Sequence, residues 1–454
     1  MTIRGNAFAL RGSFLSCIDN PFSVGDGQAL HYEADGLIII ENGKITAAGS
    51  YAETKHQLQN HPITHYADQL IVPGFIDTHV HYPQTQMIGA YGSQLIEWLN
   101  TYTFPAEMQF ADGDHANYVA EVFLNELLRV GTTTAAVYCT VHPGSADALF
   151  EAARKRRMRI IAGKVLMDRN APEGLSDTAQ SGYDDSLTLI EKWHETDRLL
   201  YAVTPRFAPT STSAQLEATA SLLKKHPSCY LQTHLSENTD ELSWVAELFP
   251  NSSDYLAVYE KYDLVGPKSI FGHAIHLHER EWQALSDANA VIAHCPTSNF
   301  FLGSGVFDQK RALQPDPPLQ PVRTGLATDV GAGTSFSMLQ TMGEAYKAGQ
   351  LKSYPLSATK AFYLATRGAA EALSVSEQIG TIAAGYEADL SVLNLHSTPL
   401  IDFRMQYCDS IEEALFVQMI LADDRATHAV YVSGELVYDT EKTTWHTNIS
   451  KVEA

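Results

Sequence analysis

Eight short apolar runs, each ending in polar residues, recur through the middle of this 454-residue sequence. They are LIVPGFIDTHVH (70–81), TTTAAVY (132–138), RIIAGKVLMD (159–168), LLYAVTPRF (199–207), CYLQTHLSE (229–237), SIFGHAIH (269–276), AVIAHCPTSN (290–299) and RTGLATDVG (323–331). Near-continuous apolar strands are typical of a parallel sheet that is buried on both faces. Because helix-like segments separate several runs, the pattern predicts an α/β fold built on a (β/α)8 barrel.

The segments between the runs carry their own signals. One helix is predicted from Asp114 to Val130, with an apolar stripe along one side and Gly131 as its C-terminal cap. The first crossover, residues 82–131, is unusually long, so we expect part of it to reach the mouth of an active site. Residues 303–321 are rich in proline and are predicted to form a loop.

The two ends of the chain resemble each other and differ from the middle. Residues 36–48 give two strands around Asn42-Gly43, and residues 388–395 and 429–438 give further strands, the last turning at Ser433-Gly434. Neither end has enough strands to enclose a core, so we expect the ends to combine. The predicted domains are a composite β-sandwich from residues 1–70 plus 380–454 and a metal-dependent barrel from residues 71–379.

Composition argues against several classes of protein. The 31 Lys and Arg residues against 53 Asp and Glu residues give a net charge of −22, which disfavours nucleic acid as a partner. The five cysteines are scattered and form no CxxC pair, which argues against a disulfide scaffold and a cysteine-based zinc site. Without an apolar signal segment or a run of about 18 apolar residues, we expect a soluble cytoplasmic protein with no membrane partner.

Candidate metal ligands lie at the ends of three of the runs. His79 and His81 are two residues apart on a strand, so both side chains would point to the same face. His234 ends the fifth run and Asp329 the eighth. Taken singly, these are more often a chance histidine pair, a core histidine and a helix-capping aspartate than metal ligands. Together, three neutral imidazoles and a carboxylate suit Zn²⁺ or another borderline divalent ion, with one position left for water.

Two further residues are candidates for catalysis. Glu237 follows His234 by three residues and suits a proton shuttle, although a solvated loop carboxylate is an equally simple interpretation. His273, in the sixth run, could polarise a water molecule or stabilise a tetrahedral intermediate, or it could only support the ligands. Nothing singles out the other strand-end histidines, which are interpreted as structural or supporting: His142, His276, His278 and His294.

Other catalytic templates are missing from the sequence. It contains no HExxH, no GxSxG and no P-loop, and the HxE…PCxxC pattern of cytidine deaminases fails because there is no CxxC. Gly331-Ala332-Gly333 lacks the third glycine of a dinucleotide fingerprint. A nicotinamide or flavin cofactor is therefore not indicated.

The sequence resembles the amidohydrolase superfamily and, within it, the guanine deaminase family. The resemblance rests on PGFIDTHVH (73–81), THLSEN (233–238), HCPTSN (294–299), ATDVG (327–331) and IGTIAAGYEADLSVL (379–393), in order over most of the chain. It implies a barrel with a composite β-sandwich and one zinc ion held by His79, His81, His234 and Asp329. The superfamily's two-metal members carry a lysine at the end of the fourth strand, where this sequence offers Arg206, so a mononuclear site is implied.

The resemblance also implies the hydrolysis of guanine to xanthine and ammonia, with Glu237, Asp329 and His273 as catalytic residues. The implied substrate-binding residues are His81, Gln84, Arg206, Phe207, His234, Glu237 and Asp329. Their chemistry agrees, since an Arg fork matches O6 and N7 of guanine, Gln84 can donate and accept, and Phe207 can pack on a flat ring. The simpler alternatives are a loop salt bridge for Arg206 and a core position for Phe207.

Two rival functions remain open from the sequence. One is another deaminase or a chlorohydrolase of the same superfamily, acting on a triazine, a pterin or a modified nucleoside. The other is a catalytically silent scaffold, which the full set of three histidines, Asp329 and Glu237 disfavours. The resemblance further implies a homodimer.

Overall fold

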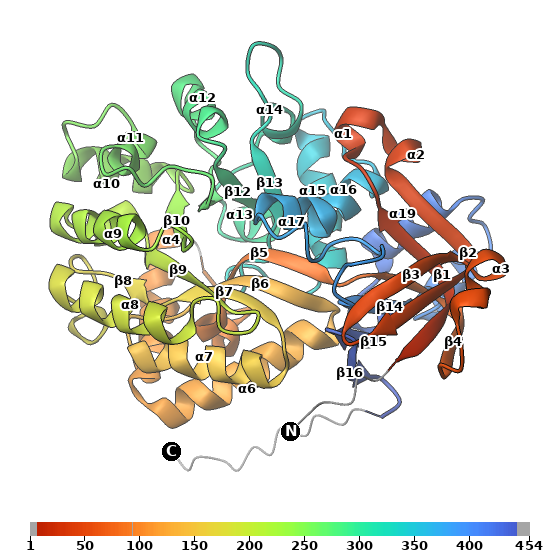
Figure 1. Cartoon of the computed structure of the whole chain (residues 1–454). Helices are drawn as coiled ribbons and strands as arrows, with labels where there is room; N and C mark the ends of the chain where they lie inside the picture. Colours follow the sequence, from red (N-terminus) through yellow and green to blue (C-terminus); the bar gives the residue numbers. More distant parts are fainter. Residues whose placement is uncertain (1–6, 93, 443–454) are drawn as a thin grey trace.

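A nearly closed barrel of parallel strands forms the centre of the computed structural model, which describes residues 7–92 and 94–442 (Figure 1). Its hydrogen-bonded path consists of β5 (Phe75–His81), β6 (Thr132–Tyr138), β7 (Arg159–Gly163), β9 (Leu200–Pro205), β10 (Tyr230–Leu235), β11 (Ser269–His273), β12 (Val291–His294) and β13 (Arg323–Leu326). A short strand, β8 (Val165–Leu166), pairs with β9 beside this path. The eight apolar runs therefore form the barrel, and the predicted fold class is confirmed.

The barrel closes between its first and last strands at their carboxyl ends. The amide of Asp329 donates to the carbonyl of His79 at 2.9 Å, and the amide of His81 donates to the carbonyl of Val330 at 2.9 Å. These bonds join the segment after β13 to β5, the strand that carries two candidate ligands. Residues that are far apart in sequence are thereby held side by side.

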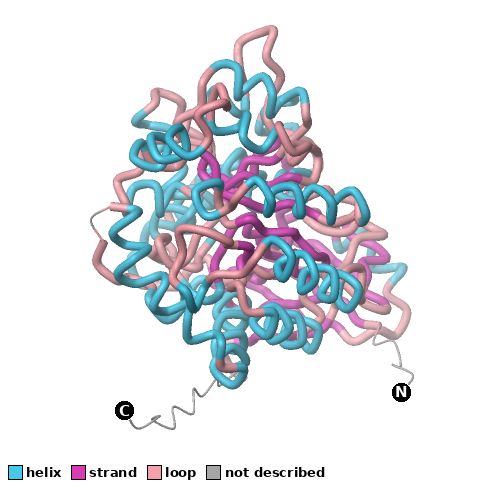
Figure 2. The backbone as a smooth tube through the Cα atoms, turned by 90° about the vertical axis from the view of Figure 1, so that its left-hand side faces the viewer, coloured by secondary structure: helices cyan, strands magenta, loops and turns pink. Residues whose placement is uncertain are grey.

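Helices surround the barrel strands (Figure 2). They include α6 (Gly113–Arg129), α7 (Pro143–Lys155), α8 (Ala179–Trp193), α9 (Ser213–Lys225), α10 (Thr239–Leu248), α11 (Tyr255–Glu260), α12 (Glu279–Asp287), α13 (Pro296–Phe301), α15 (Met338–Leu351), α16 (Ala358–Ala365) and α17 (Arg367–Ala372). In α6 the apolar stripe Val119, Phe123 and Leu127 is buried, as amphipathic spacing predicts. Gly131 follows with φ of +85°, which confirms the predicted cap.

A second, mixed sheet contains strands from both ends of the chain. Its order is β16-β15-β14-β4-β1-β2-β3. The first end supplies β1 (Phe8–Cys17), β2 (Leu30–Glu41), β3 (Lys44–Ser50) and β4 (Ile63–Pro73), and the other end supplies β14 (Leu390–Asn394), β15 (Thr427–Val432) and β16 (Glu435–Asp439). Both predicted hairpin turns form with positive φ, at Asn42-Gly43 (54° and 80°) and Ser433-Gly434 (48° and 75°).

The mixed sheet bends over a core of its own. Ile38 and Ile40 of β2 belong to the same buried cluster as Leu390 and Val392 of β14. The hydroxyl groups of Tyr66 and Tyr431, from β4 and β15, lie 2.7 Å apart. Opposite halves of the sheet therefore face each other across this core, so that neither end of the chain could form it alone.

Ion pairs and one hydrogen bond fasten the mixed sheet to the barrel. Arg198, two residues before β9, contacts Asp389 at 2.5 Å and Glu387 at 2.7 Å, and its side chain is 11% exposed. Arg159 of β7 contacts Glu387 at 2.8 Å. The hydroxyl of Ser391 in β14 donates to the carbonyl of Gly131 at 2.7 Å. The domain boundaries expected at residues 70 and 380 stay a prediction, but the contacts across them are extensive.

Two details of the sequence-based prediction are wrong. The run 70–81 is divided, because Leu70–Pro73 completes β4 of the mixed sheet and only Phe75–His81 belongs to the barrel. Gly74 separates them, where a Cβ atom would lie 2.2 Å from the hydroxyl oxygen of Thr133. The segment 303–321 is not entirely loop, because it contains the short helix α14 (Gln309–Leu313).

Smaller helices occupy the connections. The first crossover contains a 3-10 helix (Tyr82–Met87), α4 (Leu95–Trp98), a π-helical turn (Leu99–Thr103), α5 (Phe104–Met108) and a second 3-10 turn (Gln109–Ala111). The terminal parts contain α1 (Pro21–Val24), α2 (Asp26–Ala29), α3 (Tyr51–Thr54), α18 (Pro399–Met405) and α19 (Ile411–Leu421). Among the described residues, no helix is long and apolar enough to cross a membrane.

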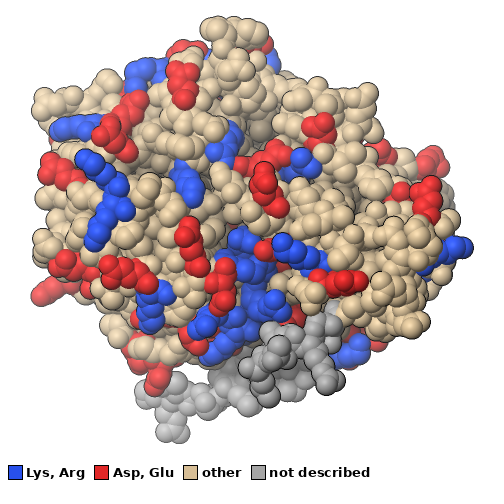
Figure 3. Space-filling model, in the orientation of Figure 1, with Lys and Arg blue, Asp and Glu red and all other residues tan. Residues whose placement is uncertain are grey.

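On the face shown in Figure 3, acidic and basic side chains alternate over most of the surface, and several Lys and Arg side chains gather at its lower centre. The most basic stretch of the sequence is the run of four residues at 154–157. Its arginines pair with carboxylates, Arg154 with Asp197, Arg156 with Glu121 and Arg157 with Glu435. These pairs reduce the positive charge that the run would otherwise present to a phosphate backbone.

Candidate active site

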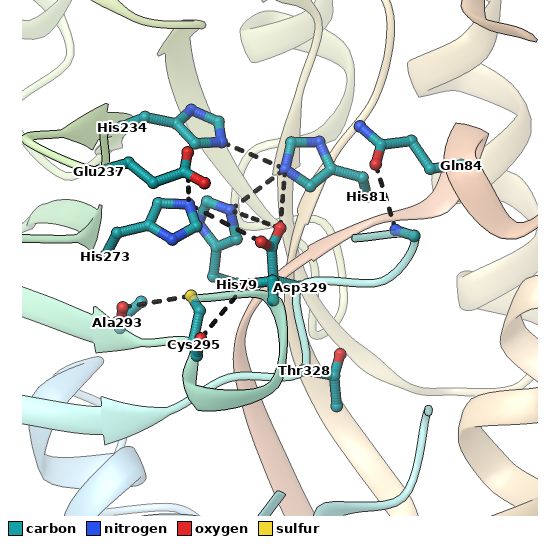
Figure 4. A network of polar contacts seen from close by, with 12 residues as sticks. His79, His81, Gln84, His234, Glu237, His273, Ala293, Cys295, Thr328 and Asp329 are labelled. Atoms are coloured by element: carbon teal, nitrogen blue, oxygen red, sulfur yellow. Dashed lines mark hydrogen bonds and ion pairs between the residues drawn. The ribbon is translucent and has the colours of Figure 1, made fainter. Parts of the chain in front are cut away.

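Four side chains predicted as metal ligands meet at the carboxyl ends of the barrel strands (Figure 4). His79 and His81 come from β5, His234 from β10, and Asp329 from the segment after β13. The Nε2 atom of His81 lies 3.1 Å from that of His79 and 3.3 Å from that of His234. Asp329 Oδ1 lies 3.3 Å from Nε2 of both His79 and His81.

The protonation of the histidines suits a cation at their centre. Burial lowers the pKa of His79 and His234 and brings the pKa of His81 to about 3, so all three imidazoles are neutral at pH 7. His234 Nδ1 lies 2.7 Å from the carbonyl oxygen of Arg206, to which it donates, and this leaves the Nε2 lone pair facing the cluster. Nδ1 of His79 and of His81 has no hydrogen-bond partner among the described residues.

Asp329 carries the negative charge of this cluster. Burial alone would raise the pKa of its carboxyl group, but the adjacent His79 and His81 outweigh that effect and hold the pKa well below its usual range. Its backbone is in the left-handed region, with φ of +49°, which turns the side chain back toward β5. The nitrogens of His79, His81 and His234 lie within 4.8 Å of one another, and Asp329 contacts the first two. Three neutral nitrogens and one carboxylate match the donor set of a divalent ion such as zinc.

Glu237 lies beside this cluster as a protonated acid. Its side chain is buried, and burial together with the charge of Asp329 raises its pKa to about 8. The hydroxyl of Ser304 donates to Glu237 Oε1 at 3.1 Å. At neutral pH the carboxyl group therefore holds a proton that it can transfer, and the interpretation as a solvated loop carboxylate does not fit its burial.

His273 connects Glu237 with Asp329. Its Nε2 atom lies 3.4 Å from Glu237 Oε2 and 3.7 Å from Asp329 Oδ2. Its Nδ1 atom lies 2.9 Å from Oδ1 of Asn299, an acceptor, so Nδ1 carries the hydrogen and Nε2 faces the carboxylates. Asn299 was not identified from the sequence as a site residue, although it ends the HCPTSN motif.

A pocket with an empty volume of about 390 Å³ opens beside the cluster. One wall is polar and includes His81, His234, Glu237, His273 and Asp329, and the other wall is mainly apolar. The apolar residues are Leu95, Trp98, Leu99, Phe207, Leu302 and Ala332. Since the first three come from the long first crossover, the prediction that this segment reaches the mouth is confirmed.

Arg206 and Gln84 line the same pocket and share a partner, Glu107. Arg206 Nη1 donates to Glu107 Oε1 at 2.8 Å, and Gln84 Nε2 donates to the same oxygen at 3.3 Å. Gln84 Oε1 accepts from the amide of Gly331 at 3.1 Å (Figure 4). Gln84 can therefore offer the pocket an N–H donor, whereas the sequence suggested that it could donate and accept. Glu107 was missed, and its only signal was an acidic residue in the crossover expected at the mouth.

Phe207 lines the pocket, whereas His276, His294 and Lys164 lie outside its lining. Phe207 is buried, and its ring lies 6.5 Å from that of His234. His276 Nε2 lies 2.8 Å from the carbonyl oxygen of Ser304, which places it behind the loop that contacts Glu237. The ring of His294 lies against that of Phe307, with ring centres 4.6 Å apart and planes tilted by 30°. Lys164, which follows β7, is fully buried and contacts Asp177 at 2.8 Å.

The fold and the cluster define a metal-dependent hydrolase of the barrel type. The sequence profile of the Amidohydrolase family matches residues 70–437, which is more than half of the chain. The chain belongs to the amidohydrolase family.

Within that family, several proteins similar to this chain are guanine deaminases. The guanine deaminase of Escherichia coli K12 is 49% identical over 435 residues, which cover 95% of this chain and 98% of that protein. Its solved structure superposes with a TM-score of 0.92, covering 95% of this chain and 99% of the other. A guanine deaminase of C. acetobutylicum, solved with guanine in its active site, is 28% identical with a TM-score of 0.85 and covers 95% of this chain and 100% of its own.

Proposed function

We propose that this protein is a zinc-dependent guanine deaminase that hydrolyses guanine to xanthine and ammonia. The observation that carries the proposal is the position of Arg206 and Gln84, which direct N–H donors into a pocket that also contains the His/Asp cluster and Glu237. Guanine presents O6 and N7 as acceptors to such donors. The 49% identity to a guanine deaminase over 95% of the chain supports the same substrate.

One Zn²⁺ per subunit is the cofactor of the proposal, with His79, His81, His234 and Asp329 as its ligands. The neutral imidazoles and the charged carboxylate suit zinc because it prefers nitrogen donors and accepts an open fourth or fifth position. When bound, the ion would increase the acidity of water so that hydroxide is available at neutral pH.

The chain's own residues move the protons of the reaction. Asp329 accepts the proton that water releases as its oxygen attacks C2 of guanine. Glu237, protonated at neutral pH because its pKa is about 8, donates to ring N3 and so prevents negative charge from accumulating on the ring. His273, held by Asn299 and adjacent to Glu237, stabilises the tetrahedral adduct. The ionised Glu237 then takes the proton of the new C2 hydroxyl and passes it to the departing amine, so that the C2 carbonyl forms as ammonia leaves. The proton held by Asp329 returns to Glu237 and restores the starting state.

Substrate placement follows from the rest of the pocket. Arg206 and Gln84 donate to the O6 and N7 side of guanine, so C2 points toward the His/Asp cluster. Phe207 packs on the flat ring, and His81 and His234 flank it.

The decisive experiment follows guanine by ultraviolet absorbance in the presence of zinc-loaded protein. Conversion to xanthine with release of one ammonia supports the proposal. Ammonia or chloride release from a triazine or a pterin, with guanine unchanged, would assign the chain to the rival hydrolases. Turnover of guanosine would contradict the proposal, because the added ribose needs more room than guanine does. No turnover of any member of the panel would favour a scaffold.

A homodimer and a cytoplasmic location complete the proposal. Exposed apolar side chains on and beside α18 support self-association, since Leu400, Phe403 and Tyr407 are 64%, 55% and 62% exposed. The mass in solution, measured by light scattering, distinguishes a dimer from a monomer. Small-molecule chemistry, rather than nucleic acid or membrane binding, agrees with the net charge of −22 and the pocket beside the cluster.

A further inference from the structure

Glu107 is a carboxylate with no solvent exposure that contacts two residues lining the pocket, Arg206 and Gln84. It belongs to α5 of the first crossover and is 99 residues away from Arg206 in sequence. Both of its oxygens accept from Arg206 Nη1, at 2.8 and 2.9 Å, and Oε1 also accepts from Gln84 Nε2 at 3.3 Å. A single buried carboxylate thus contacts the two side chains that would bind O6 and N7.

The contacts of Glu107 determine which atoms remain for a ligand. Arg206 contacts Glu107 through Nη1 alone. No described residue accepts a hydrogen bond from its Nε or Nη2 atom, so these donors remain for a ligand. Gln84 Oε1 is bound by the amide of Gly331, so only the second hydrogen of its Nε2 is available. This end of the pocket consequently offers donors alone, and a matching ligand must present acceptors.

The same contacts determine the charge of this end of the pocket. Arg206 is 3% exposed, so its guanidinium is removed from water and needs a counter-charge. Glu107 supplies that charge from within the protein, and the pair is neutral overall. A neutral ligand then gains hydrogen bonds, whereas an anionic ligand meets no unpaired cation and lies near a second negative charge.

We propose that Glu107 is a positioning and specificity-determining residue that fixes the donors of Arg206 and Gln84 and makes the pocket select neutral oxopurines over anionic ones. The proposal rests on the proposed function, because it takes the pocket to be a purine site. The buried Arg206–Glu107 salt bridge then helps to distinguish neutral from anionic ligands, and it also holds the first crossover against the barrel.

The test compares two oxopurines of nearly the same shape, one neutral and one anionic. Hypoxanthine is neutral at pH 7.5, whereas 8-azahypoxanthine is an anion because its triazole N–H is acidic, and neither has the 2-amino group that is removed. Dissociation constants are measured by calorimetry on zinc-loaded protein. The variants are Glu107→Gln, which removes the charge, and Glu107→Asp, which keeps it. Glu281→Gln is the control, since Glu281 is equally buried but accepts from the amides of Leu256 and His278 instead.

Each outcome has a definite meaning. The wild-type protein and the Glu281→Gln variant should prefer hypoxanthine. In Glu107→Gln, the ratio of the two dissociation constants should change by about tenfold or more in favour of the anionic 8-azahypoxanthine, because Arg206 loses its counter-charge. Glu107→Asp should weaken both ligands by displacing the donors but keep the wild-type ratio. An unchanged ratio in Glu107→Gln, or the same shift in Glu107→Asp, would overturn the proposal.

A second pair of measurements covers the loss of stability that an unpaired buried arginine can cause. Thermal melting reports whether Glu107→Gln is folded. If it is not, the double variant Glu107→Gln/Arg206→Gln removes both charges, and it should fold without any shift toward the anion. A shift in the double variant, or loss of the hypoxanthine preference in Glu107→Asp, would contradict the proposal. Failure of the wild-type protein to release xanthine would overturn the proposed function instead, because the ligand ratio is measured without turnover.

Discussion

At the scale of single residues, Glu237 shows how the fold changes the chemistry of an ordinary side chain. Exposed glutamates are ionised at neutral pH, but burial and the nearby charge of Asp329 raise the pKa of this one to about 8. The carboxyl group can thus act as a general acid at neutral pH. Only the surroundings, and not the residue type, produce this property.

Replacing Glu237 with glutamine should remove the proton donor while leaving the shape of the side chain unchanged. We expect kcat for guanine to fall by about 10²- to 10⁴-fold, which is the usual contribution of general acid–base catalysis. Metal content, measured by atomic absorption, should stay at the wild-type level because Glu237 is not among the proposed ligands. The Glu281→Gln variant is the matched control and should keep its activity. Near-normal turnover by Glu237→Gln with metal bound would refute the shuttle.

The residues predicted from the sequence and those that were missed differ in a consistent way. His79, His81, His234 and Asp329 end apolar runs, so the pattern of apolar and polar residues is enough to mark their positions. The missed residues touch those or other site residues only after folding: Asn299 on His273, Ser304 on Glu237, and Glu107 on Arg206. Partnerships across 26 to 99 residues leave no periodic pattern in the sequence.

At the scale of elements, the loop between α13 and α14 positions the hydroxyl that contacts Glu237. Ser304 lies between two glycines with positive φ, Gly303 at 65° and Gly305 at 141°. Such conformations are readily adopted by glycine alone, which explains how so tight a turn reaches the pocket. His276 secures the loop by contacting the carbonyl of Ser304 at 2.8 Å.

Replacing Ser304 with alanine should change the pH dependence of the reaction. The serine hydroxyl stabilises the ionised form of Glu237 and so lowers its pKa, as any donor to a carboxylate does. Its loss raises the pKa, and Glu237 therefore stays protonated to a higher pH. The alkaline limb of the kcat profile should move upward by about one pH unit, as expected for a hydrogen bond to a charged group. Ser286→Ala, at a hydroxyl that donates to the Gln320 carbonyl, should leave the profile in place. A downward shift of the alkaline limb in Ser304→Ala would contradict the prediction, because it would mean that the hydroxyl raises the pKa of Glu237.

At the scale of the whole molecule, stability depends on how the mixed sheet is attached to the barrel. Replacing Arg198 with leucine should leave the buried carboxylate of Asp389 without its partner. Breaking a buried pair in this way costs about 3–5 kcal/mol in the free energy of unfolding. Urea denaturation measures the loss, and kcat of the folded fraction should be retained. Arg154→Leu is the control, because the Arg154–Asp197 pair is more than half exposed and should cost about 1 kcal/mol or less. Equal losses in the free energy of unfolding for Arg198→Leu and Arg154→Leu would contradict the role of Arg198 in attaching the mixed sheet to the barrel.

Removing the metal should affect both activity and stability. We expect a chelator to abolish xanthine formation and zinc to restore it. Because the ion binds only the folded cluster, zinc at 100 times its dissociation constant should stabilise the protein by about 2.7 kcal/mol. Differential scanning calorimetry with and without zinc measures this shift. Full activity in protein shown to be metal-free would refute the zinc-dependent mechanism.

The sequence by itself determined the barrel, its eight strands, the joining of the two chain ends, and the histidines and aspartate at the strand ends. It could do so because burial on both faces imposes local, periodic patterns on the sequence, and because each strand end is marked by a change from apolar to polar residues. Only the tertiary structure decided that Gln84 acts as a donor, that Glu237 holds a proton and that Glu107 neutralises Arg206. Those properties depend on contacts and burial between residues distant in sequence, which no local pattern encodes.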